Sequence, residues 1–126
     1  MVARARYLVA AILCAGALLG RAEAEPVARW RGLTASGKVA QNAELHWHTP
    51  RLAPGDYRFE LTGTEGDADL YVRVGSPPTP QTFDCRPAKR DSNETCFVHL
   101  AQPAVIHVMV RGSAPMSTFR LVGRAR

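Results

Sequence analysis

Two aspartates, Asp67 and Asp69, stand between a glycine turn and an alternating apolar run in GDADLYVRVG (66–75). Residues two apart on a strand point to the same face, so we expect both carboxylates on the solvated side of the fold. Carboxylates are ligands of Ca²⁺, which takes six to eight oxygens, and the pair is therefore a candidate calcium site. The interpretation that we favour is structural: Asp67 caps the turn, and Asp69 pairs with a neighbouring arginine such as Arg73 or Arg111.

His46 and His48 show the same spacing in ELHWH (44–48) and would share one face of a strand. Imidazoles at this spacing can chelate zinc or copper. A third ligand would have to come from His99 or His107. The alternative is an exposed strand face that binds no metal.

A third candidate is a ligand-binding face made of Tyr71, Arg73, His107 and Arg111. These residues lie at outward or end positions of two expected strands, 68–74 and 105–111. If the strands adjoin, tyrosine and arginine, which are enriched at binding hot spots, would stack on a sugar or grip an extended peptide. The alternative is that the two arginines only neutralise the two aspartates.

Catalytic motifs are absent from the sequence. Neither G-x-S-x-G nor H-E-x-x-H occurs, and no Ser-His-Asp or Cys-His set can be argued. We therefore predict that the protein is not an enzyme.

The elements that must position these residues are strands, because apolar residues recur with period two. In DYRFELT (56–62), for example, Tyr57, Phe59 and Leu61 alternate with polar residues. Such alternation is typical of half-buried antiparallel strands. The six segments with this pattern are 44–48, 56–62, 68–74, 94–100, 105–111 and 117–123. Proline and glycine turns separate them, and the spacing predicts an all-β fold, a β-sandwich or jelly roll.

The N-terminal part of the chain is expected to be a signal peptide. Arg4 and Arg6 precede an apolar run at 8–20, and Ala22-Glu23-Ala24 supplies an A-x-A cleavage site. A membrane anchor is the alternative, but a bilayer needs about 20 apolar residues. We expect a leader at 1–24 and one domain at 25–126, secreted or periplasmic and free of the membrane after cleavage.

The charge and cysteine pattern limits the function further. The chain has a formal net charge of +5, but its basic residues are scattered, which argues against nucleic acid as a partner. Cys14 leaves with the leader, so Cys85 and Cys96 should form a disulfide in an exported domain. A metal or redox pair, the other interpretation, usually has closer spacing.

The segment GDADLYVRVGSPPTPQTFDCRPAKRDSNETC (66–96) resembles the signature of the bacterial pre-peptidase C-terminal domain. That signature runs D-x-D-L-Y-V-R, a Pro/Thr-rich loop, D-C-R-P and N-E-T-C. The likeness extends upstream to LAPGDYRFELTGTEGD and downstream to VHLAQPAVIHVMVRGSAPMSTFRLVG. It covers roughly residues 32–123.

This resemblance implies an antiparallel β-sandwich of jelly-roll type, similar in fold to the collagen-binding domains of bacterial collagenases. Domains of this family usually follow secreted peptidases and are not catalytic. The expected function is therefore a secreted accessory module that attaches to an extracellular polymer, protein or polysaccharide. The alternatives are an export or solubility partner in trans for a secreted peptidase, and a metal-binding protein that uses Asp67 and Asp69 or His46 and His48.

Overall fold

The computed structural model describes residues 29–87 and 89–126. The expected leader and Cys14 lie outside these residues. Seven strands follow one another in the described part: β1 (Leu33–Ala40), β2 (Glu44–His48), β3 (Gly55–Thr62), β4 (Ala68–Val74), β5 (Glu94–Leu100), β6 (Ile106–Gly112) and β7 (Met116–Ala125). The six expected strands are confirmed to within a few residues at their ends. Among the described residues, none belongs to a helix long and apolar enough to cross a membrane.

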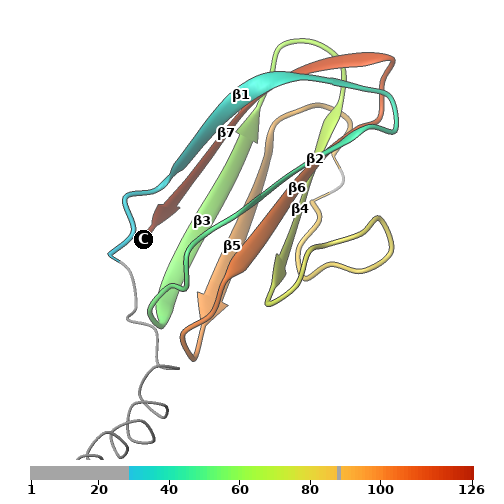
Figure 1. The fold of residues 1–126 in the computed structure, drawn as a ribbon. Helices are drawn as coiled ribbons and strands as arrows, with labels where there is room; N and C mark the ends of the chain where they lie inside the picture. Colours follow the sequence, from blue (N-terminus) through green and yellow to red (C-terminus); the bar gives the residue numbers. More distant parts are fainter. Residues whose placement is uncertain (1–28, 88) are drawn as a thin grey trace, which may run out of the picture.

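The strands form two antiparallel sheets, as Figure 1 shows. One sheet has four strands in the order β1-β7-β3-β5, and the other has three in the order β2-β6-β4. The predicted all-β, antiparallel fold is confirmed, whereas the jelly-roll type stays a prediction. β1 precedes the six expected segments and pairs with β7 along its whole length.

The core lies between the sheets and is built from the alternating residues of both. Tyr57, Phe59 and Leu61 of β3 are buried, as are Leu70 and Val72 of β4. Each large apolar side chain removed from water contributes about 1.5–3 kcal/mol. The period-two pattern therefore fixes which face of each strand turns inward.

A disulfide connects Cys85 in the long β4–β5 loop to Cys96 in β5, with Cα atoms 6.0 Å apart. Cys85 also pairs through its backbone with Val72 of β4. The disulfide therefore joins the edge of the three-stranded sheet to the edge of the four-stranded sheet, and the expected cysteine pairing is confirmed.

Replacing both cysteines by serine should lower the free energy of unfolding by about 3 kcal/mol, because the disulfide no longer restricts the unfolded chain. Urea unfolding of the oxidised protein and of the Cys85→Ser/Cys96→Ser variant measures this. Dithiothreitol should shift the wild-type midpoint and leave the variant unchanged. An unchanged wild-type midpoint would contradict a stabilising disulfide.

Candidate functional site

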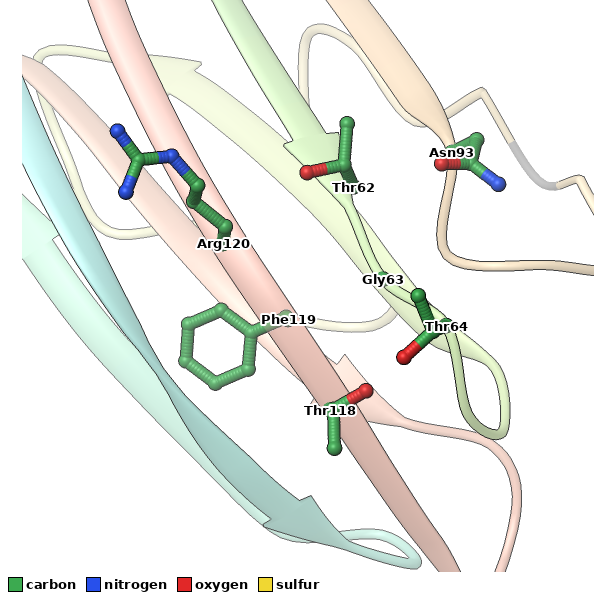
Figure 2. A pocket seen from close by; sticks show the side chains of 7 residues that line it. All are labelled: Thr62, Gly63, Thr64, Asn93, Thr118, Phe119 and Arg120. Atoms are coloured by element: carbon green, nitrogen blue, oxygen red, sulfur yellow. The ribbon is translucent and has the colours of Figure 1, made fainter.

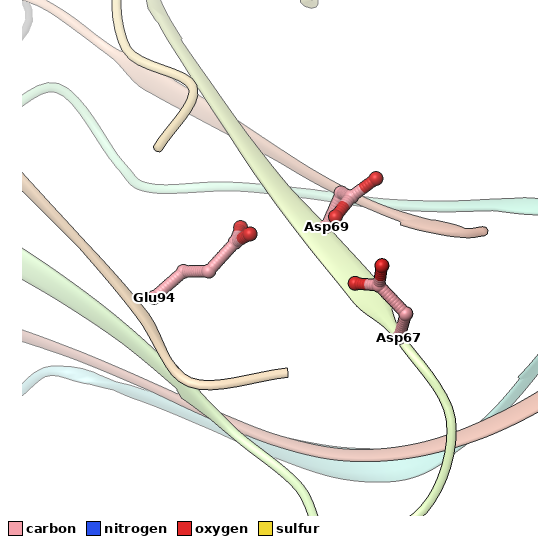
Figure 3. Close-up of side chains that lie close together, drawn as sticks. All are labelled: Asp67, Asp69 and Glu94. Atoms are coloured by element: carbon pink, nitrogen blue, oxygen red, sulfur yellow. The ribbon is translucent and has the colours of Figure 1, made fainter. Parts of the chain in front are cut away.

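Three carboxylates meet at one end of β4: Asp67, Asp69 and Glu94 each place one oxygen within 4.8 Å of the others. Figure 3 shows the two aspartates on the β4 side and Glu94 reaching toward them from the start of β5. The turn before them packs closely against the start of β7. Only glycine suits this position, because Gly66 has a φ of 73° and an added Cβ would collide with the carbonyl oxygen of Met116. Sequence reasoning identified the aspartates but not Glu94.

Asp69 is buried, not solvated as expected, and only 3 % of its surface is exposed. Its Oδ2 accepts a hydrogen bond from the Ser113 hydroxyl, and the guanidinium of Arg86 lies 3.5 Å away. The expected partners bond to other groups: Arg73 donates to the Pro77 carbonyl, and Arg111 donates to Asn42. The β4–β5 loop brings Arg86 onto this face, and the sequence around Asp69 carries no local signal of that contact.

Glu94 is almost completely buried, at 1 % exposure. Its two oxygens accept hydrogen bonds from the backbone N–H of Leu70 at 2.7 Å and of Lys89 at 2.9 Å. Burial raises the pKa of Glu94 to about 7, although the two backbone hydrogen bonds oppose the shift. The carboxyl group therefore changes charge near neutral pH.

The outer edge of β4 is sealed by groups from the β4–β5 loop and β5. Four alternate backbone N–H groups point away from β6, and each has a protein acceptor: Ser92 Oγ for Ala68, Glu94 Oε1 for Leu70, the Cys85 carbonyl for Val72 and Asp84 Oδ2 for Val74. An unpaired edge of this kind would be a template for aggregation. Several residues of the segment 84–94 therefore serve to close the outer edge of β4.

Asp67 has a different environment from its two neighbours. Its Oδ1 is buried without a hydrogen-bond partner, while its backbone N–H donates to Ser117 Oγ at 2.8 Å. Burial, together with the charge of Asp69, raises the pKa of Asp67 to about 6. A cation would supply the missing partner and offset the repulsion among the three carboxylates.

The expected ligand-binding face does not form a continuous exposed patch. Tyr71 is 2 % exposed, because the Phe83 ring packs edge-on against it and Arg86 lies over it at 5.0 Å. Arg73 donates to the Pro77 carbonyl and Arg111 to Asn42 Oδ1. The strands do adjoin as expected, but the long loop covers the part of the sheet that carries Tyr71.

A hollow in the surface lies between the end of β3 and the neighbouring part of β7. It measures about 340 Å³ and is lined by Thr62, Gly63, Thr64, Asn93, Thr118, Phe119 and Arg120. Figure 2 shows threonine hydroxyls and the Arg120 guanidinium around it. Sequence reasoning missed this hollow, because its residues come from segments that only the strand order brings together.

The histidines divide between the two sheets. His46 and His48 share one face, as expected, and His107 lies opposite His48 on β6. His99 lies on the other sheet, where its Nδ1 is 2.8 Å from Asp56. Of the two third ligands considered from the sequence, only His107 is near the pair.

Comparison with known proteins gives consistent matches. The family model described as bacterial pre-peptidase C-terminal domain matches residues 52–112. The chain is 37 % identical over 82 residues to alkaline serine exoprotease A of Vibrio alginolyticus, covering 64 % of this chain and 15 % of that protein. It is 41 % identical over 69 residues to a zinc metalloprotease of Helicobacter pylori, covering 53 % and 27 %. The chain thus spans less than a third of the length of these relatives.

Two solved structures share the architecture. The solution structure of vEP C-ter 100 is 30 % identical, with a TM-score of 0.57, and the match covers 77 % of this chain and 96 % of that one. PliG of Aeromonas hydrophila, a periplasmic lysozyme inhibitor, is 11 % identical with a TM-score of 0.58 over 82 % and 93 %. At that identity the second match shows the fold alone.

Replacing Asp67 with asparagine should stabilise the protein at pH 8 and have less effect at pH 4. A raised pKa means that the folded wild type loses stability as the pH rises from the unfolded pKa, near 4, through about 6. Because Asp67 is partly exposed, we expect the gain to reach on the order of 1 kcal/mol. Urea unfolding in EDTA across this pH range measures the gain in the free energy of unfolding. A gain that does not depend on pH would contradict the raised pKa of Asp67 as its cause.

Proposed function

The chain belongs to the bacterial pre-peptidase C-terminal domain family, and on this premise we propose that it is an exported, non-catalytic accessory module that binds an acidic extracellular polymer. The matched relatives support the non-catalytic part. One is named a serine exoprotease and another a zinc metalloprotease. A segment shared by enzymes of two catalytic chemistries is best explained as a unit separate from both active sites.

The observation that carries the binding role is Phe97, an aromatic residue in the middle of β5 that is 58 % exposed. Its ring has two arginine neighbours: the Arg126 guanidinium lies 4.7 Å from the ring centroid and that of Arg58 lies 6.0 Å away. Aromatic and arginine side chains are enriched at binding hot spots. An exposed aromatic ring with cations beside it suits a polymer that carries both apolar surface and negative charge.

The rest of this outer face carries charges of both signs, because Glu60 pairs with Arg58 at 2.7 Å and Asp56 lies 2.8 Å from His99. Arg124 lies opposite Arg58 across β3 and β7, and Arg120 lies opposite Thr62 further along the same strands. Arg120 and Thr62 also line the 340 Å³ hollow. The face therefore runs from the cationic aromatic site at Phe97 to a hollow rich in hydroxyl groups, which suits an extended ligand.

The Phe97→Ala variant should lose retention on an acidic polymer by about tenfold, the loss expected for a hot-spot aromatic. Sedimentation with alginate, pectin, chitin and collagen, at low and at high salt, measures retention. Leu45→Ala is the matched control, because Leu45 is also an exposed apolar residue but lies on β2 of the other sheet. Equal retention of wild type and Phe97→Ala on every polymer would contradict this binding face.

A peptidase is the second candidate partner, and the names of the relatives favour it. In that role the domain would associate in trans with a separately encoded secreted peptidase and keep it soluble or exportable. Capture of a secreted peptidase, together with no retention on any polymer, would replace the first proposal with this one.

The carboxylate cluster supports a calcium site as an accessory to either role. Asp67, Asp69 and Glu94 offer the hard oxygen ligands that Ca²⁺ prefers, and the unpartnered Oδ1 of Asp67 is suitably placed. The ion would tie the start of β4 to β5.

Millimolar Ca²⁺ should raise the melting temperature more at pH 8 than at pH 5.5, because protons compete for Asp67 and Glu94, whose pKa values are raised to about 6 and about 7. Calorimetric melting with Ca²⁺ or EDTA measures this. The Asp67→Asn variant should melt at the same temperature in Ca²⁺ and in EDTA. A Ca²⁺ effect that is equal at both pH values, or that persists in Asp67→Asn, would contradict the site.

A further inference from the structure

A second hollow, of about 210 Å³, lies on the outer face of the three-stranded sheet. Its lining includes three of the four histidines of the chain, with one aromatic residue and one proline: His46, Trp47, His48, Pro77 and His107. His48 on β2 and His107 on β6 are directly opposite each other. The polymer-binding face proposed above lies on the other sheet.

The pairing of β2 with β6 brings these two imidazoles unusually close. Thr49 N–H donates to the Ile106 carbonyl, and Gly112 N–H donates to that of Ala43. Hydrogen-bonded pairs alternate along an antiparallel ladder, so His48 and His107 occupy a non-hydrogen-bonded pair. Side chains are closest at such pairs, with Cα atoms about 4.5 Å apart. His46 and His48, two residues apart on one strand, have Cα atoms roughly 6.6 Å apart.

The ring positions suit a shared ion. The two ring centroids are 5.7 Å apart and the planes are inclined at 42°. Two imidazoles that bind one ion through nitrogen at 2.0–2.1 Å would have centroids roughly 5 to 6 Å apart. The separation of the two rings is therefore compatible with both imidazoles binding one ion.

Hydrogen bonding gives His48 the tautomer that a ligand needs. Its Nδ1 lies 3.1 Å from the carbonyl oxygen of Thr49. A carbonyl only accepts, so Nδ1 carries the proton and Nε2 has the free lone pair. Metal-binding histidines commonly donate their second ring nitrogen to a backbone carbonyl in this way.

The charges around His107 favour its neutral form. Burial, together with His48, Arg73 and His46, lowers the pKa of His107, and this favours the neutral imidazole that metal binding requires. Arg73 lies opposite His107 on β4 and would oppose a cation, although its guanidinium donates to the Pro77 carbonyl. Glu44, paired with His46 and Arg111, is the nearest acid on β2.

We propose that His48 and His107 together bind one Zn²⁺ or Cu²⁺ ion on the outer face of the three-stranded sheet. Imidazole nitrogens suit both metals. Two protein ligands leave positions open for water or for a donor group of a partner. His46 also lines the hollow, but its Nε2 lies 3.3 Å from Glu44 Oε1.

Titration calorimetry of the tag-free protein with Zn²⁺ at pH 7.5 tests the site. We expect one ion per chain, and His48→Ala or His107→Ala should weaken binding at least about tenfold. The matched control is His99→Ala, which removes a histidine from the other sheet and should leave binding unchanged. Binding should also weaken as the pH is lowered, because metal ligands must be deprotonated.

Nitrogen-15 spectra of the imidazole rings provide a readout that does not depend on substitution. Zn²⁺ should shift the ring nitrogens of His48 and His107 and leave those of His99 in place. Two results would overturn the proposal: no heat of Zn²⁺ binding to the wild type, or binding that survives in both single variants. Binding that is lost in Asp67→Asn instead would assign the zinc to the carboxylate cluster.

Discussion

The structure depends on the closure of the outer edge of β4. A strand at the edge of a sheet exposes a row of N–H groups that must find water or another chain. Here every second amide from Ala68 to Val74 finds an acceptor in the segment that runs from Asp84 to Glu94. The disulfide to Cys96 holds that segment in place. Burying the Glu94 carboxyl group is costly, and its two backbone hydrogen bonds offset part of that cost.

This closure explains why the most recognisable residues of the chain are not those that we propose as the binding surface. Glu94 and Asp84 accept from the backbone of β4, and Arg86 covers Tyr71 and pairs with Asp69. The carboxylate cluster follows from this arrangement, with only Asp67 left incompletely bonded. The binding surfaces that we propose therefore lie outside the motif, on the outward faces of the two sheets. Relatives of different catalytic chemistry can share such a scaffold.

The strands could be predicted from the sequence because alternation is local. The same alternation contained a signal for Glu94: the buried row Cys96, Val98 and Leu100 extends back by two residues to position 94. A charged residue in an inward row indicates a buried polar contact. Reading that row to its end would have identified the third member of the cluster.

The other parts of the site required tertiary information. Tyr71 lies on the outward side of β4 as expected, but the long loop covers it, and no periodicity reveals where a loop folds back. Whether His99 or His107 lies near His46 and His48 depended on which sheet each strand joins. The exposure of Phe97 could not be predicted for a related reason. The sequence of β5 alternates as in any half-buried strand, and only the structure shows that its outer face is not covered by another element.

Hydrogen exchange of the β4 amides, measured by nuclear magnetic resonance before and after reduction, tests the edge closure most directly. In the oxidised protein the outward amides of Ala68, Leu70, Val72 and Val74 should exchange as slowly as those that pair with β6. After reduction the outward amides should exchange much faster while the β6-paired ones stay protected. Rapid exchange of the outward amides in the oxidised protein would contradict the account.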